Sequence, residues 1–126
     1  MIIIVTGSRN YTDSRRVREI LLSITLDSNI NKEDITMYHG GCRGADRCSE
    51  QVAKTFGWKV KTFHADWSQY GLKAGPIRNQ RMVDEAINSN DKIKVIAIHE
   101  DINNSKGTID MINRCKKAGL DVSLYS

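Results

Sequence analysis

Runs of apolar, mostly β-branched residues alternate along this chain with segments whose apolar residues recur at helical spacing. The runs cover residues 2–6, 35–39, 58–63, 93–98 and 122–124. The first, up to Thr6, and the fourth, apart from Lys94, are continuously apolar rather than apolar at every second residue, as is typical of strands buried on both faces of a sheet. Strands of this kind, alternating with helices, form a parallel sheet joined by right-handed crossovers.

Four segments between the runs carry the helical spacing. Asp13 can cap the first helix, Gly44 precedes the second, Pro76 suits the first position of the third, and Gly107 begins the fourth. The sequence therefore predicts an α/β fold, a Rossmann-like three-layer sandwich of about five mostly parallel strands with helices on both faces. The helix residues expected to face the core are Val17, Ile20, Leu21, Ile24, Ala45, Cys48, Val52, Ala53, Phe56, Met82, Val83, Ala86, Ile87, Thr108, Met111, Ile112 and Cys115.

Composition limits the class of protein. The 126 residues fit one domain, 1–126, and the apolar start is too short for a secretion signal or a membrane span, so we expect a cytoplasmic protein with no membrane partner. Three cysteines without zinc-ligand spacing indicate reduced thiols, and we expect no metal and no cofactor. The net charge of +4 suits an anionic ligand or nucleic acid, or serves solubility alone.

Four of the predicted strands lead into clusters of glycine, arginine and short polar residues. A strand, a glycine turn and a helix start together present backbone N–H groups to an anion. Because the carboxyl ends of parallel strands share one edge of a sheet, we predict a phosphate-bearing ligand at that edge. The candidate ligand-binding residues are Gly7, Ser8, Arg9, Gly40, Gly41, Arg43, Gly44, Asp66, Trp67, Arg78, Asn79, Gly107 and Thr108.

Individual roles in these clusters have alternatives. The Ser8 hydroxyl can donate to a phosphate oxygen, with Arg9 adding a bidentate contact, or the pair can simply form a tight turn. Arg43 would project over a helix N-terminus. Asp46 either interacts with the helix dipole or binds a ribose hydroxyl and places a water. Thr108 is either a helix N-cap or a ligand contact.

The stretch from His64 to Asn79 is too long for a simple connection and suits a lid or binding segment. Asn79 falls on the inward stripe of the third helix, so its amide must be hydrogen-bonded, either to a neighbouring loop or to a ligand. Trp67 and Tyr70 either stack on a base or anchor the loop by packing.

These motifs together resemble the SLOG superfamily and, more narrowly, its small single-domain YspA-like branch of bacteria and phages. The resemblance lies in Gly7-Ser8-Arg9, Gly-Gly-Cys-Arg-Gly-Ala-Asp at 40–46, Asp66-Trp67, Gly-Pro-Ile-Arg-Asn at 75–79 and Gly107-Thr108. It implies a Rossmann-like fold that binds a nucleotide or nucleotide-derived ligand. Superfamily relatives include phosphoribohydrolases that cut an N-glycosidic bond, nucleotide-sensing modules and the DNA-processing protein A.

The chain departs from the phosphoribohydrolase pattern at its last motif. Met111 stands where those relatives carry a catalytic glutamate, and the nearest acid, Asp110, is one residue early. One residue rotates a helix position by about 100°, which turns Asp110 away from the site. Asp46 and Asp110 are the candidate catalytic carboxylates for any hydrolysis of the N-glycosidic bond.

Three functions are compatible with these residues. The first is nucleotide binding with hydrolysis of the glycosidic bond, and the second is a nucleotide sensor or scavenger without turnover. The third is a module for single-stranded nucleic acid, with Trp67 and Tyr70 stacking on bases. A homo-oligomer is compatible with each of them.

Overall fold

The computed structural model describes residues 1–126 and contains one five-stranded sheet in the order β3-β2-β1-β4-β5. Every neighbouring pair of strands is parallel. The strands are β1 (Ile2–Gly7), β2 (Thr36–His39), β3 (Lys59–Thr62), β4 (Ile93–Ile98) and β5 (Val122–Tyr125). The predicted α/β fold is confirmed, and each strand end lies within one residue of its predicted position.

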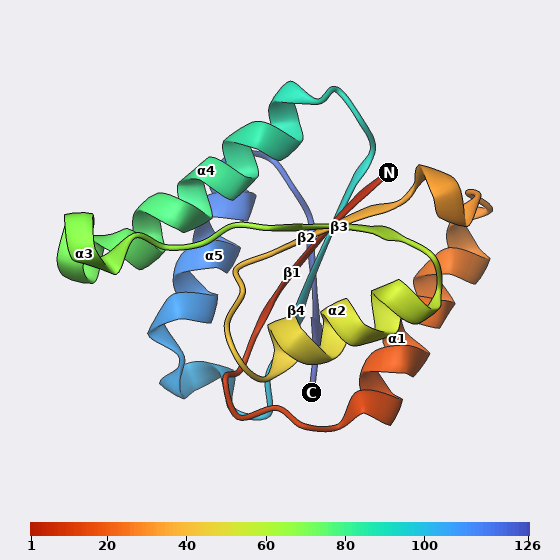
Figure 1. The fold of residues 1–126 in the computed structure, drawn as a ribbon, viewed down its shortest axis with the longest axis horizontal. Coiled ribbons are helices and arrows are strands. Elements are labelled where there is room, and N and C mark those ends of the chain that lie inside the picture. The colour runs from red at the N-terminus through yellow and green to blue at the C-terminus, as the bar shows by residue number, and fades with distance from the viewer.

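Helices cover both faces of the sheet, which gives the predicted three layers (Figure 1). The helices are α1 (Ser14–Ser28), α2 (Ala45–Thr55), α3 (Trp67–Tyr70), α4 (Ala74–Asn88) and α5 (Lys106–Lys117), with single 3₁₀ turns η1 (Lys32–Asp34), η2 (Gly71–Lys73) and η3 (Ile102–Asn104). Ile3 and Val5 of β1 belong to the core cluster under α1 and α2, while Ile2 and Ile4 belong to the cluster under α4 and α5. Burial on both faces explains why β1 is apolar throughout.

The central strand β1 lies between β2 and β4. From β1 the chain proceeds outward through β2 to β3, and then crosses back to β4 on the other side. The order of the strands therefore reverses next to β1, and in open α/β sheets ligands bind in the crevice outside the carboxyl ends of the strands at such a point. The segments after β1 and β4 border this crevice.

The third helical segment differs from its prediction at both ends. Helix α4 begins at Ala74, so Pro76 is its third residue, still in the first turn, where its missing N–H costs no intrahelical hydrogen bond. Ile87 is 40% exposed, although it was expected to face the core. At about 100° per residue, it lies at the margin of the stripe formed by Asn79, Met82 and Val83.

None of the helices combines the length and the apolar character that a membrane crossing requires. All three cysteines are free thiols. Burial raises the pKa of Cys115 to about 11, whereas Cys42 and Cys48 are partly exposed.

Candidate functional site

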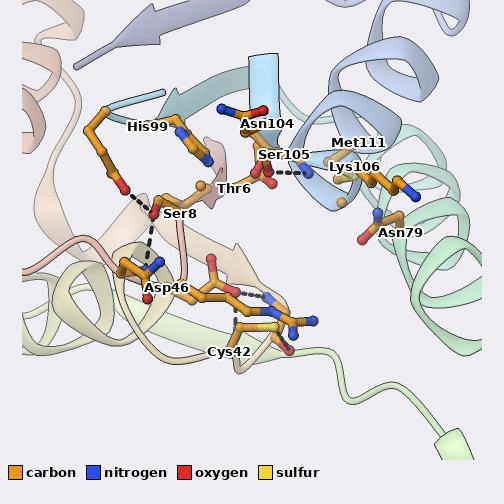
Figure 2. A pocket seen from close by; sticks show the side chains of 18 of the residues that line it. Thr6, Ser8, Cys42, Asp46, Asn79, His99, Asn104, Ser105, Lys106 and Met111 are labelled. Carbon is orange, nitrogen blue, oxygen red and sulfur yellow. Dashed lines mark hydrogen bonds between the residues drawn. The ribbon is translucent and has the colours of Figure 1, made fainter. Parts of the chain in front are cut away.

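A cleft of about 600 Å³ opens at the carboxyl edge of the sheet, at the position predicted from the reversal of strand order. Figure 2 shows Ser8, Asp46 and Cys42 on one side of it and Asn104, Ser105 and Lys106 on the other. Its 21 lining residues come from the end of β1, from the segments that follow β1, β2 and β4, and from helices α2, α4 and α5. The cleft is polar, because only four of these residues are hydrophobic.

The cleft brings together most of the residues singled out in the sequence. Those that line it are Gly7, Ser8, Arg9, Gly40, Asp46, Arg78, Asn79, Gly107 and Thr108. Six others lie outside its lining, namely Gly41, Arg43, Gly44, Asp66, Trp67 and Asp110. Their proposed contacts with a ligand therefore need a separate argument for each residue.

Helix α5 begins at the cleft with a cap supplied by Ser105, whose hydroxyl accepts a hydrogen bond from the Thr108 N–H over 3.3 Å. Thr108 is therefore not the N-cap but the third residue of the helix. Its side chain is 2% exposed and its hydroxyl has no hydrogen-bond partner in the protein. The N–H groups of Lys106 and Gly107, at the first two positions of the helix, precede the repeating helical hydrogen bonds and also have no protein acceptor. This helix start offers several unused donors to the cleft.

Three N–H groups of the glycine loop before α2 are satisfied from within the protein. Asp46 Oδ2 accepts hydrogen bonds from the N–H groups of Gly40 and Cys42, both over 3.2 Å. His39 Nδ1 accepts a third from the N–H of Gly41 over 2.9 Å. These three of the N–H groups that the sequence assigned to a phosphate thus bind two side chains of the chain itself.

Asp46 is 6% exposed at the bottom of this loop. Burial raises the pKa of its carboxyl, against the opposing influence of His39, the two loop N–H groups and Arg78. Asp46 Oδ2 accepts the two loop hydrogen bonds, which fixes the conformation of residues 40–42. Asp46 also lies in the first turn of α2, where the helix dipole favours its charge, which is one of the two roles weighed from the sequence. The contact with a ribose stays a prediction.

Ser8 is held by two partners of its own. Its hydroxyl donates to Glu100 Oε1 over 2.7 Å and accepts from the Asn10 N–H over 3.0 Å. The proton that the sequence assigned to a phosphate oxygen is therefore directed at a carboxylate. The hydrogen bond from Ser8 holds the pKa of the Glu100 carboxyl below its usual value.

Arg78 lies against the glycine loop. Its Nη1 donates to the carbonyl oxygen of Gly40 over 2.7 Å, and its Nε donates to Asn79 Oδ1 over 2.8 Å. A Cβ on residue 40 would lie 2.6 Å from that Nη1, so a glycine there leaves room for the guanidinium. The second terminal nitrogen, Nη2, has no partner in the protein and is available to a ligand.

The candidates outside the cleft have structural contacts of their own. Asp66 caps the short helix α3, accepting from the Gln69 N–H over 3.1 Å. Trp67 is 49% exposed and its ring lies 3.4 Å from the position of a Cβ on Gly75. Arg43 is exposed and donates to Asn10 Oδ1 over 3.4 Å. Asp110 accepts hydrogen bonds from Asn79 of α4 and from Arg114, on the side of α5 that faces α4.

Several lining residues were not among the sequence candidates. Glu100 and Asp101 follow β4, and Asn104, Ser105 and Lys106 lead into α5. This segment lacks the glycine and arginine pattern of the other clusters until Gly107. Its position directly after a strand at the reversal of strand order was the available signal. No group of three His, Cys, Asp or Glu side chains is arranged to hold a metal ion.

The all-parallel sheet, with a polar cleft at the carboxyl ends of its strands, defines a Rossmann-like α/β protein. Residues 1–70 match the model of the YspA, cpYpsA-related SLOG family, and the chain belongs to that family. The resemblance found in the motifs is thereby confirmed, although the motifs at 75–79 and 107–108 lie beyond the matched residues.

Two individual proteins are similar to the chain over nearly its whole length. The Gene 61 protein of Mycobacterium phage D29 is 27% identical over 125 residues, covering 95% of this chain and 92% of the phage protein. The X-ray structure of DNA processing protein A (DprA) from Streptococcus pneumoniae aligns with 98% of the chain at 14% identity and a TM-score of 0.48. The chain spans only 58% of that DprA chain.

Proposed function

We propose that residues 1–126 act as a single domain whose cleft binds a nucleotide or nucleotide-derived ligand, with a phosphate against the first turn of α5. The observation that carries this proposal is the Thr108 hydroxyl, which lies in the cleft lining and makes no hydrogen bond within the protein. The hydroxyl oxygen is not cut off from the cleft, so it is free to bind water or a ligand there. A ligand oxygen can take the place of that water and accept the proton of the hydroxyl.

The surroundings of Thr108 suit a phosphate. The free N–H groups of Lys106 and Gly107 point out of the helix start, where the helix dipole favours negative charge. The Lys106 side chain adds a cation to the cleft. Together these groups offer the anion several donors from one rigid element.

The segment after β4 carries negatively charged acceptors, in contrast to the donors at the start of α5, and this suits the hydroxyl groups of a sugar. Glu100 and Asp101 are exposed carboxylates in the cleft lining, and carboxylate oxygens accept hydrogen bonds from hydroxyl groups. The lining as a whole holds three cations (Arg9, Arg78 and Lys106) and three carboxylates (Asp46, Glu100 and Asp101). This balance suits a ligand that combines a phosphate with hydroxyl groups better than one that carries charge alone.

The arrangement favours binding without turnover over hydrolysis. Of the two candidate catalytic acids, Asp110 lies outside the cleft lining and Asp46 is bound to the glycine loop. Met111, in the place of the relatives' glutamate, is 1% exposed and contributes an apolar side chain to the lining. Incubation with a panel of nucleotides, followed by chromatography for free base, tests this. Release of free base by the wild type would favour the hydrolase function instead.

Binding of single-stranded nucleic acid is the second candidate, and the exposure of Trp67 and Tyr70 on α3 favours it. These side chains are 49% and 43% exposed, and neither lines the cleft. Stacking of bases on both, together with phosphate contacts, would make the affinity fall steeply with salt. An affinity for oligonucleotides that exceeds the affinity for mononucleotides and has this salt dependence would favour this function.

Calorimetric titration with AMP tests the phosphate site. Replacing Thr108 by valine keeps the shape and removes the hydroxyl, and we expect an affinity for AMP about tenfold weaker, the loss of one hydrogen bond to a charged group. Thr36→Val is the matched control, because Thr36 begins β2 at the opposite edge of the sheet and its hydroxyl makes no hydrogen bond. If wild type and Thr108→Val bind AMP equally, the phosphate does not lie at this helix start.

A further inference from the structure

A chain of hydrogen bonds runs from the side of α5 that faces α4 to the glycine loop in the cleft. Arg114 Nε donates to Asp110 Oδ2 over 2.8 Å, and Asn79 Nδ2 donates to the same oxygen over 3.0 Å. Asn79 Oδ1 accepts from Arg78 Nε over 2.8 Å, and Arg78 Nη1 donates to the Gly40 carbonyl over 2.7 Å. Three elements far apart in the sequence are joined by this relay.

The donors and acceptors of this relay can be arranged in one way only. The guanidinium of Arg78 can only donate, and the carboxylate of Asp110 can only accept. The amide of Asn79 between them must therefore turn its oxygen to Arg78 and its nitrogen to Asp110. Asn79 is 6% exposed, so no water replaces either contact easily. A flipped amide would set two donors against each other and two acceptors against each other.

Arg78 needs such support because its side chain is long and flexible. Fixing a free arginine side chain on ligand binding costs conformational entropy. In this protein Nε and Nη1 are already held by Asn79 and Gly40, while Nη2 has no protein partner. A ligand that meets Nη2 therefore binds a guanidinium whose orientation is fixed beforehand.

The charge of Asp110 is stabilised at the outer end of the relay. Burial opposes its ionisation, but the hydrogen bonds from Arg114 and Asn79 outweigh this effect and hold the pKa of the carboxyl below its usual value. Asp110 thus remains an acceptor at neutral pH, which is the state that the orientation of Asn79 requires.

We propose that Asn79 and Asp110 are positioning residues, which hold the Arg78 guanidinium against Gly40 so that its free nitrogen faces the ligand in the cleft. This assigns a role to Asp110 although it lies outside the cleft lining. The effect on ligand affinity rests on the nucleotide binding proposed above. The effect on Arg78 itself does not, and it can be measured without a ligand.

The first experiment follows the Arg78 Nε–H by ¹⁵N NMR in the protein without ligand. In the wild type this proton is hydrogen-bonded and exchanges slowly with water; in Asp110→Ala we expect exchange to be at least about tenfold faster, as expected for a weakened hydrogen bond. Asp27→Ala is the matched control, since Asp27 is an exposed helical aspartate without a hydrogen bond or ion pair. Unchanged exchange in folded Asp110→Ala would overturn the relay.

The second experiment exchanges the two side chains. Asn79→Asp sets two carboxylates side by side, and we expect it to weaken AMP binding about tenfold or more. The double variant Asn79→Asp with Asp110→Asn restores a complementary pair, because the carboxylate now at position 79 accepts from Arg78 and from the amide now at position 110. We expect it to bind AMP within about threefold of the wild type and to protect the Arg78 Nε–H again.

The outcomes separate the two proposals. A double variant that binds AMP no better than Asn79→Asp would overturn the positioning role, as would faster exchange in Asp110→Ala with unchanged AMP affinity. A wild type that binds no AMP would instead remove the proposed nucleotide function. In that case the exchange rates in Asp110→Ala and in the double variant still decide whether the relay holds Arg78.

Discussion

Asp46 Oδ2 lies 3.2 Å from the backbone nitrogen of Gly40, so the first turn of α2 holds the loop that leads into it. The same oxygen accepts from Cys42, which leaves the carboxylate in the position that an anion would take in an open glycine loop. The loop is thereby shaped before any ligand arrives. The start of α5 lines the same cleft and offers free N–H groups to an anion.

Asp46→Ala is predicted to destabilise the protein. Two N–H groups would lose a charged acceptor in a buried place, and we expect the free energy of unfolding to fall by about 2–4 kcal/mol. Denaturation with urea measures this. Asp46→Asn should cost less, because its amide oxygen can still accept one of the bonds. If Asp46→Ala unfolds like the wild type, other contacts hold the loop.

Two glycines of the same loop should respond differently to alanine. Gly44 has φ +81°, and a Cβ there would lie 2.2 Å from the carbonyl oxygen of Ser8, so Gly44→Ala is expected to cost at least about 2 kcal/mol of stability. At Gly40 the three atoms nearest to a Cβ all belong to the end of the Arg78 side chain, which can move, whereas those at Gly44 belong to the backbone. Gly40→Ala should therefore cost less stability than Gly44→Ala, while weakening AMP binding because it displaces the guanidinium from the Gly40 carbonyl. Equal destabilisation by both substitutions would contradict this assignment.

Ser8→Ala is predicted to change the pKa of Glu100. Because the hydroxyl of Ser8 stabilises the ionised carboxylate, its removal should raise the pKa of Glu100 toward the usual value, which a ¹³C NMR titration of the glutamate carboxyls measures. The Asn10 N–H also loses its acceptor, at a cost of about 1 kcal/mol. An unchanged Glu100 titration would show that Ser8 does not control this carboxylate.

The relay through Asp110 predicts a dependence of stability on acid. The pKa of Asp110 in the folded protein lies below 3.8, the value of an aspartate in the unfolded chain. Between these two pKa values the unfolded chain binds more protons, so stability falls as the pH falls. The stability gained from ionised Asp110 is complete above the pKa of the unfolded chain and is lost as the pH falls through the pKa of the folded protein. The difference in unfolding free energy between wild type and Asp110→Asn should therefore be constant above about pH 5 and shrink below about pH 4. A difference that grows in acid would contradict the sign.

Met111→Glu tests the missing catalytic glutamate. Placing a carboxyl at a position that is 1% exposed should lower the free energy of unfolding by about 2–4 kcal/mol. If the cleft shares the relatives' geometry, the variant should release free base from a nucleotide that the wild type leaves intact, as measured by chromatography. If the variant folds, binds AMP and releases no base, the hydrolase function should be dropped in favour of ligand binding alone.

The fold could be predicted from the sequence because its signals are local. Residues 2–5 are an unbroken β-branched run, and Met82, Val83 and Ala86 have helical spacing. Each of these patterns reflects the geometry of a single strand or helix. The common edge for the clusters followed from the parallel order of the strands. Pro76 and Ile87 were misjudged at the ends of one helix, where the first turn tolerates proline and the apolar stripe runs out.

The partners of individual polar groups could be decided only by the tertiary structure. Ser8 and Glu100 are 92 positions apart, and Asn79 and Asp110 are 31 apart, so no local spacing announces either contact. The glycine loop has the composition of an open anion site, yet the N–H groups of its first three residues bind Asp46 and His39. A hydrogen bond depends on directions and distances of a few tenths of an ångström, which arise only when all layers are packed together. Composition and spacing determined where the cleft lies, and packing determined which donors in it remain free.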